Sequence, residues 1–227
     1  MQTAFVTGAT SGIGRALVLQ LVERGVTVFA TGRDRDRLRE LMDETGCLGE
    51  AFDLAEPESA EAAYVRARRA LGVAPDFVIN NAGFNSRKAE LVQTNDEELE
   101  LQWAVNLRAP LVIAREALRD MTARRSGHLV NVLSTVVKLG IERMSLYSAM
   151  KHGLHGATLS LIKEARPHGV KVTGVYPGGT DSGFRVEDRP DYLAPASVAH
   201  MICGVLFAPA DVVVHELTFR PLVESNF

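Results

Sequence analysis

A glycine-rich turn directly after the first apolar run, Ala4–Val6, constrains the fold of this chain more than any other feature. The turn reads Thr7-Gly8-Ala9-Thr10-Ser11-Gly12-Ile13-Gly14 and opens an expected helix. Gly8 permits a tight turn, Gly12 lets the backbone approach a pyrophosphate, and Gly14 allows close packing of the helix. The spacing G-x-x-x-G-x-G differs from the usual dinucleotide fingerprint. Because a helix N-terminus presents N–H donors and a positive dipole end, we expect this turn to bind an anion.

Short apolar runs alternate with longer helix-compatible segments along the chain. Such runs suit strands buried on both faces, and their alternation with helices predicts βαβ units in a parallel sheet. The expected strands include Ala4–Val6, Thr27–Ala30, Phe77–Ile79, His128–Leu133, Val170–Tyr176 and Val212–Phe219. The expected helices are Gly12–Arg24, Arg35–Glu44, Pro57–Leu71, Asp96–Arg125, Ser145–Pro167 and Ala196–Phe207. A length of 227 residues favours a single domain, residues 1–227, with helices on both faces of one sheet.

Glycines are expected to end several of these helices, at Gly25, Gly46, Gly72 and Gly169. The segment of about residues 180–193 has no clear periodicity and follows an expected strand. It is either a substrate loop that covers a ligand or a plain surface connection.

Composition excludes several classes of function. A net charge of −3, without a long run of Lys or Arg, offers no footprint for nucleic acid. No apolar stretch approaches the roughly 18 residues that span a bilayer, and the early first strand leaves no room for a signal peptide. The two cysteines, Cys47 and Cys203, have no partners at metal-ligand spacing and are expected to be buried free thiols. We therefore expect a cytoplasmic protein without a metal site.

Further motifs follow in an order that resembles the short-chain dehydrogenase/reductase family, whose first loop reads TGxxxGIG. They are Asp53-Leu54, Asn80-Asn81-Ala82-Gly83, Asn106, Ser134, Tyr147-Ser148-Ala149-Met150-Lys151 and Pro177-Gly178. The resemblance spans nearly the whole chain, and the spacing from Ser134 to Tyr147 is the one usual in the family. It implies a Rossmann-like, doubly wound parallel β-sheet of about seven strands in an α/β/α three-layer sandwich. It also implies a nicotinamide-dependent oxidoreductase.

The residue that closes the second strand of a dinucleotide fold selects the cofactor. An acidic side chain there accepts from the ribose 2′-hydroxyl, whereas a nearby Arg accommodates a 2′-phosphate. Alignment with the family puts Gly32 where NAD-preferring members carry Asp, and Arg33 follows it. A guanidinium can grip a phosphate through paired hydrogen bonds, and Gly32 has no carboxylate to repel it. We therefore expect NADP(H), although Asp34 and Asp36 nearby could soften that preference.

Tyr147 and Lys151 are four positions apart on an expected helix and so share one face. A free tyrosine has a pKa of about 10, and both the Lys151 ammonium and the nicotinamide ring of the oxidised cofactor would favour its phenolate. The resemblance assigns Tyr147 to protonate the developing alkoxide and Ser134 to donate a hydrogen bond to the same oxygen. It assigns Lys151 also to the nicotinamide ribose, and Asn106 to a water held against Lys151. Alternatively, Asn106 is a helix-interior amide that pairs with backbone.

The resemblance further implies individual cofactor contacts. Asp53 would bind the adenine amino group, and Asn80 and Ala82 would line the adenosine ribose. Thr180 and Ser182 would hold the carboxamide, although the family often reads PGxVxT there. The complete expected cofactor set is Gly8, Thr10, Ser11, Gly12, Ile13, Gly14, Arg33, Asp53, Leu54, Asn80, Ala82, Gly83, Tyr147, Lys151, Pro177, Gly178, Thr180 and Ser182.

The expected substrate is a small carbonyl compound or alcohol, because the segments around the site mix apolar residues with one or two cations. The expected pocket wall consists of Phe84, Asn85, Val136–Leu139, Met144 and Thr180–Arg189, including Phe184 and Arg185. The charge of Arg185 motivates the hypothesis that it faces a substrate carboxylate; the alternative for each wall residue is a packing role. Family members usually pack two long helices into an oligomer, so Asp96–Arg125 and Ser145–Pro167 predict a homodimer or homotetramer. Two alternatives remain: a regulatory protein that senses NADPH without catalysis, and a sugar-nucleotide epimerase or dehydratase, which usually needs a longer C-terminal domain.

Overall fold

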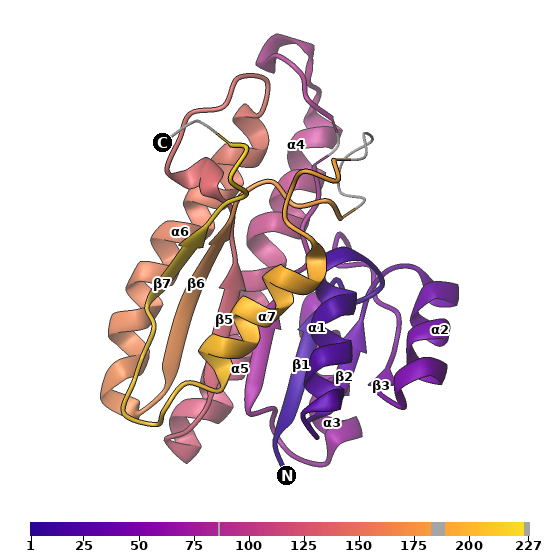
Figure 1. Cartoon of the computed structure of the whole chain (residues 1–227), viewed down its shortest axis with the longest axis vertical. Helices are drawn as coiled ribbons and strands as arrows, with labels where there is room; N and C mark the ends of the chain where they lie inside the picture. The colour runs from indigo at the N-terminus through magenta and orange to yellow at the C-terminus, as the bar shows by residue number, and fades with distance from the viewer. Residues whose placement is uncertain (86, 183–188, 225–227) are drawn as a thin grey trace.

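Seven parallel strands form one sheet in the computed structural model, which describes residues 1–85, 87–182 and 189–224 (Figure 1). The strands are β1 (Thr3–Thr7), β2 (Thr27–Thr31), β3 (Leu48–Gly49), β4 (Phe77–Asn80), β5 (His128–Val132), β6 (Lys171–Pro177) and β7 (Glu216–Phe219). Their order is β3-β2-β1-β4-β5-β6-β7, and each neighbouring pair is parallel. The chain therefore winds outward in one direction, returns beside β1 and winds outward in the other. This confirms the expected Rossmann-like, doubly wound sheet.

Side chains alternate between two cores because successive residues of a strand point to opposite faces of the sheet. On β1, Ala4 and Val6 enter one core and Phe5 enters the other. On β5, Val130 and Leu129 divide in the same way. All these residues are fully buried, so the strands need apolar side chains at consecutive positions, as the sequence pattern indicated.

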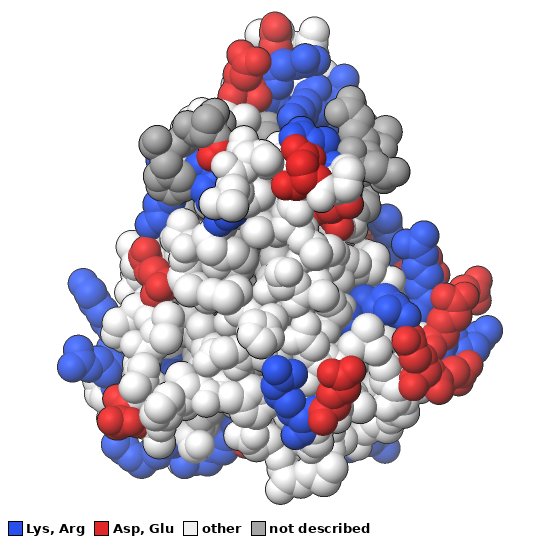
Figure 2. Space-filling model, in the orientation of Figure 1, with Lys and Arg blue, Asp and Glu red and all other residues white. Residues whose placement is uncertain are grey.

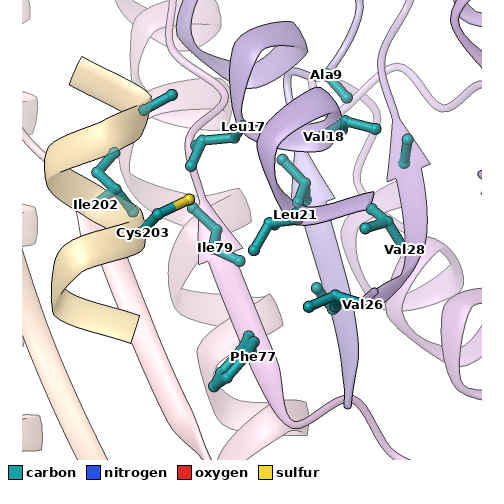
Figure 3. Close-up of a cluster of buried hydrophobic side chains, with 14 of the residues drawn as sticks. Ala9, Leu17, Val18, Leu21, Val26, Val28, Phe77, Ile79, Ile202 and Cys203 are labelled. Atoms are coloured by element: carbon teal, nitrogen blue, oxygen red, sulfur yellow. The ribbon is translucent and has the colours of Figure 1, made fainter. Parts of the chain in front are cut away.

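Helices cover both faces. The helices are α1 (Gly12–Glu23), α2 (Arg35–Thr45), α3 (Ser59–Leu71), α4 (Asp96–Trp103), α5 (Ala109–Arg124), α6 (Ser145–Ala165) and α7 (Pro195–Leu206). On one face, Leu17 and Leu21 of α1 pack with Ile202 and Cys203 of α7 over Ile79 of β4 (Figure 3). Side chains of α3, α5 and α6 fill the core on the other face. The sandwich therefore has three layers.

The helix ends and cysteines mostly follow the sequence expectations. Gly46, Gly72 and Gly169 cap helical segments in the left-handed conformation, with φ of 69°, 73° and 71°, where a side chain would be strained. Cys47 and Cys203 are buried free thiols. Several bounds differ slightly: α3 begins at Ser59 rather than Pro57, and α6 ends at Ala165, before a 3₁₀ turn.

The expected helix Asp96–Arg125 is not uniform. A wide π turn, Ala104–Arg108, separates α4 from α5. Pro110 has no N–H group for the carbonyl of Asn106 four residues earlier, so the regular α-helical bond cannot form there. Single π turns are common at functional sites, and this one contains Asn106.

The expected strand Val212–Phe219 is also wrong in its first half, because β7 begins only at Glu216. In the segment just before β7, backbone carbonyls accept hydrogen bonds from side chains of β6. Lys171 Nζ donates to the carbonyl of Val212 at 2.6 Å, and Thr173 Oγ1 donates to that of Val214 at 2.5 Å. These bonds replace ladder pairing, so regular strand pairing starts later.

Charged side chains lie mainly around the rim of the face seen in Figure 2. The middle of that face, over α1 and α7, is mostly uncharged. Met201 on α7 and Phe207, which caps its C-terminal end, are each 39% exposed. Within the described ranges, no helix combines the length and the apolar character that crossing a membrane requires.

Candidate active site

A cavity of about 720 Å³ lies where the loops after β1, β2, β4, β5 and β6 meet. Ligands of doubly wound sheets bind at this edge, beyond the carboxyl ends of the strands. The predicted residues that line the cavity are Gly8, Thr10, Ser11, Gly12, Ile13, Arg33, Asp53, Leu54, Ala82, Gly83, Ser134, Tyr147, Lys151, Pro177, Gly178, Thr180 and Ser182. Three predicted residues, Gly14, Asn80 and Asn106, lie behind this lining.

The glycine turn brings the N-terminus of α1 to the cavity. Gly12 has φ of +50°, and a Cβ there would lie 2.9 Å from Ser182 Cβ. A Cβ on Gly14 would lie 2.1 Å from the carbonyl oxygen of Gly8, so only glycine lets α1 pack on its own loop. The N-cap residue, Ser11, makes no side-chain bond to the first turn of α1. The first N–H groups of α1 are therefore available to a phosphate.

Asn80 does not line the cavity, because its side chain is buried and points into the core. Its Nδ2 donates to the carbonyl of Pro110 at 3.0 Å and to Asn131 Oδ1 at 2.9 Å. Asn81 lines the cavity instead, and its Nδ2 donates to the carbonyls of Thr7 and Gly8 at 3.0 and 3.3 Å. The doubled asparagine was visible in the sequence, but the residue that ties two cavity loops together is the second one.

The loop after β2 leaves a basic side chain at one end of the cavity. A Cβ on Gly32 would lie 2.5 Å from Thr10 Cγ2, so an acidic side chain at this position would collide with the glycine turn. Arg33 is exposed and lines the cavity. The Asp34 carboxylate caps α2 by accepting from two N–H groups of its first turn, and it pairs with Arg37 at 3.4 Å. The Asp34 carboxylate is thus bound to the first turn of α2 and to Arg37, so these contacts hold it apart from the role of repelling an anion at Arg33.

The cavity is more positive than the chain as a whole. Its described lining carries five basic and three acidic side chains, a net charge of +2, whereas the whole chain carries −3. Together with the open helix N-terminus, this charge fits a ligand that carries several phosphates. The chemistry of the lining therefore suits a polyanionic ligand.

Tyr147 and Lys151 both line the cavity, one turn apart on α6. The Lys151 Nζ lies 5.7 Å from the centre of the Tyr147 ring and donates to the carbonyl of Val132 at 3.0 Å. Lys151 is only 2% exposed, and this burial lowers its pKa from the ordinary value of 10.5 to about 8. Ser134 Oγ accepts from Val136 N at 3.3 Å, so its hydroxyl proton can still be donated to a ligand oxygen.

Asn106 is fully buried in the π turn, behind Gly83. Its Oδ1 accepts from the N–H of Phe84 at 3.0 Å, and its Nδ2 donates to the carbonyl of Phe84 at 2.6 Å and to Gln102 Oε1 at 2.7 Å. Gln102 Nε2 in turn donates to Asn85 Oδ1 at 3.0 Å. The amide of Asn106 does pair with backbone, and it thereby fixes the loop after β4 beside Lys151. No motif in the sequence indicated a role for Gln102.

The expected substrate wall agrees only partly with the observed cavity lining. Six of its described residues line the cavity: Phe84, Asn85, Val136, Met144, Thr180 and Ser182. Five do not: Val137, Lys138, Leu139, Asp181 and Arg189. Phe184 and Arg185 lie outside the described residues. The stems of the 180–193 segment are joined by a bridge between Thr180 and Leu193. Tyr192, from the predicted loop of about residues 180–193, also lines the cavity. The lining further includes residues that were not expected: Lys88, Leu101, Val105, Ile141, Arg220 and Glu224.

Comparison with known proteins gives consistent matches. The family model described as short chain dehydrogenase matches residues 2–193. An uncharacterized oxidoreductase of Staphylococcus aureus (strain MRSA252) is 32% identical over 225 residues, 96% of each chain. Serine dehydrogenase from Escherichia coli superposes with a TM-score of 0.89 at 26% identity, over 99% of this chain and 100% of that one. A metagenomic short-chain oxidoreductase in complex with NADP gives 0.86 at 30% identity, over 98% of each. The chain therefore belongs to the short-chain dehydrogenase/reductase family of oxidoreductases.

Proposed function

We propose that this protein transfers hydride between NADP(H) and a small carbonyl or alcohol substrate, with Tyr147 as the general acid and base. The observation that carries the proposal is that Ser134, Tyr147 and Lys151 line the same cavity as the glycine turn and Arg33. A protein that only sensed NADPH would not need a buried lysine beside a tyrosine. Burying such a cation costs free energy, and perturbed groups of this kind are concentrated at active sites.

The cofactor would extend along the cavity. The N-terminus of α1 would hold the pyrophosphate, and Arg33 would bind the 2′-phosphate. Asp53 and Ala82 would contact the adenosine, while Lys151, Pro177, Thr180 and their neighbours would frame the nicotinamide end. The NADP bound by the metagenomic relative supports this choice of cofactor.

The proton transfer would take place around the substrate oxygen. Bound NADPH supplies a hydride to the carbonyl carbon. Ser134 donates a hydrogen bond to the carbonyl oxygen, whose negative charge grows as the reaction proceeds. Tyr147 gives its hydroxyl proton to that oxygen, and the Lys151 ammonium stabilises the phenolate that remains. In the oxidation of an alcohol, the same phenolate would take the proton back.

Asn106 would support this proton transfer from behind. Its amide holds the Phe84 backbone, and its Oδ1 lies 3.4 Å from the position that a Cβ on Gly83 would occupy, with Lys151 Nζ 3.6 Å from the same point. Asn106 and Lys151 therefore flank Gly83 at the base of the cavity. We propose that this arrangement holds the water through which Tyr147 regains its proton from solvent.

We also propose a homodimer or homotetramer formed through α5 and α6. Leu159 on α6 and Trp103, next to the π turn, are each 40% exposed and would offer apolar surface to such an interface. The mostly uncharged middle of the face over α1 and α7 would provide a second contact surface (Figure 2).

The test is NADPH oxidation by the purified protein against a panel of aldehydes, ketones, oxoacyl thioesters and oxo acids. We expect turnover with at least one class, and a large loss in Tyr147→Phe with NADPH binding retained. NADPH binding without turnover across the panel would favour the sensor. Equal turnover in Tyr147→Phe would refute the assigned role of Tyr147.

A further inference from the structure

The turn after β6 is held by four hydrogen bonds that use every backbone polar group of Gly178 and Gly179. The N–H of Gly178 donates to the carbonyl of Phe219 at 2.8 Å, and its carbonyl accepts from Thr180 Oγ1 at 3.1 Å. The carbonyl of Gly179 accepts from the N–H of Leu193 at 3.0 Å. The fourth partner is a charged side chain, because the N–H of Gly179 donates to Glu224 Oε1 at 3.1 Å.

The Glu224 carboxylate is itself fixed by a second contact. Its Oε2 accepts from Arg220 Nε at 2.8 Å, four residues earlier in the segment after β7. The two side chains are only 9% and 14% exposed, although both reach the wall of the cavity. An ion pair with so little solvent around it is screened weakly and has a defined geometry.

The close approach of these groups depends on the absence of side chains in the turn. A Cβ on Gly178 would lie 2.6 Å from Glu224 Oε2 and 3.0 Å from Arg220 Cγ. A Cβ on Gly179 would lie 2.2 Å from the Tyr192 ring. A side chain at Gly178 would therefore displace the Arg220–Glu224 pair, and one at Gly179 would displace Tyr192.

We propose that Glu224, oriented by Arg220, is a positioning residue that fixes the Gly178–Gly179 turn at the nicotinamide end of the cofactor site. The inference rests on the proposed function, in which Pro177, Gly178 and Thr180 frame that end. Removal of the carboxylate leaves the Gly179 N–H without its partner and leaves a buried guanidinium beside the turn. The adenosine end is held by other loops, so the loss should be confined to the nicotinamide half.

Calorimetric titration with two ligands tests this division. NADPH fills both halves of the proposed site, whereas adenosine 2′,5′-bisphosphate probes the adenosine half alone. We expect Glu224→Ala to weaken NADPH binding by about tenfold or more and to change binding of the bisphosphate by less than about twofold. Glu224→Gln keeps an acceptor for Gly179 and should fall between wild type and Glu224→Ala. Glu61→Gln is the matched control, since it removes a carboxylate from an ion pair with Arg115 that does not line the cavity.

Amide hydrogen exchange of Gly179 in the ligand-free protein gives a second readout that is independent of the cofactor. We expect faster exchange of this amide in Glu224→Ala, with the core strands unchanged. Unchanged NADPH affinity, or an equal loss for both ligands, would overturn the positioning role. Wild-type protein that bound neither ligand would refute the NADP site itself, whereas unchanged Gly179 exchange would refute the role of Glu224 alone.

Discussion

Replacement of Lys151 by Met should stabilise the ligand-free fold while it abolishes catalysis. Burial lowers the Lys151 pKa from 10.5 to about 8, which corresponds to about 3 kcal/mol against the charged form at neutral pH. Met has a similar volume and no charge, so it avoids this cost. Loss of the hydrogen bond to the Val132 carbonyl destabilises the fold by about 1 kcal/mol and so reduces this gain. The net gain is about 2 kcal/mol, or about 4–8 °C in Tm for a chain of this size.

The pH dependence gives this prediction a sharper form. Between pH 8 and about 10.5 the unfolded chain binds more protons than the native protein at Lys151, so wild-type stability rises with pH in that window. Lys151→Met lacks this contribution, and its advantage should shrink by about 2 kcal/mol between pH 7 and pH 9.5. Urea unfolding at both pH values measures the difference, with exposed Lys163→Met on the same helix as control. A less stable Lys151→Met at pH 7, or an advantage independent of pH, would refute the reasoning.

Three further predictions concern the cofactor site, the glycine turn and assembly. Arg33→Ala should weaken NADPH binding by about tenfold to a hundredfold and leave NADH binding unchanged. The control Arg35→Ala should alter the affinity for neither cofactor. Fluorescence titration measures both affinities, and an equal loss for the two cofactors in Arg33→Ala would exclude a 2′-phosphate contact. Gly14→Ala should destabilise the fold by about 1–3 kcal/mol. Gly204→Ala, whose Cβ would meet open space, should stabilise the fold by up to about 1 kcal/mol. Urea unfolding that gave both variants a change of the same sign would contradict the packing argument. Light scattering should give two or four times 24.7 kDa, and a monomer would contradict the proposed helix interface.

Much of the architecture was predictable because local pattern and global fold agree. A strand such as β1 must be apolar on both faces, and the glycines that end helices do so because they adopt positive φ. The glycine turn was equally readable, since Gly12 and Gly14 sit where any side chain meets backbone or a neighbouring loop. Such features depend on a few adjacent residues, so the sequence displays them directly.

The features that were not predictable depend on contacts between distant segments. No residue near Val212 in the sequence indicates that a side chain of β6 will donate a hydrogen bond to its carbonyl, or that β7 will begin late. Prediction of the π turn would have required noticing that Pro110 cannot donate to the carbonyl of Asn106. Both residues lie in a segment whose apolar pattern is helical from end to end. Glu224 contacts Gly179 across 45 positions of sequence, and Gln102 hydrogen-bonds both Asn85, which lines the cavity, and Asn106. A resemblance carried by short motifs does not include such partners.

The central claim is that Tyr147 moves the proton in a reaction whose hydride comes from NADPH. The most direct measurement is the single-turnover rate of NADPH oxidation with the best carbonyl substrate, together with the Kd for NADPH, in wild type and Tyr147→Phe. Removal of a general acid typically costs about 10²- to 10⁴-fold in rate. We predict a loss of that size in Tyr147→Phe with the Kd unchanged within about twofold. A Tyr147→Phe protein that oxidised NADPH as fast as wild type would contradict the account.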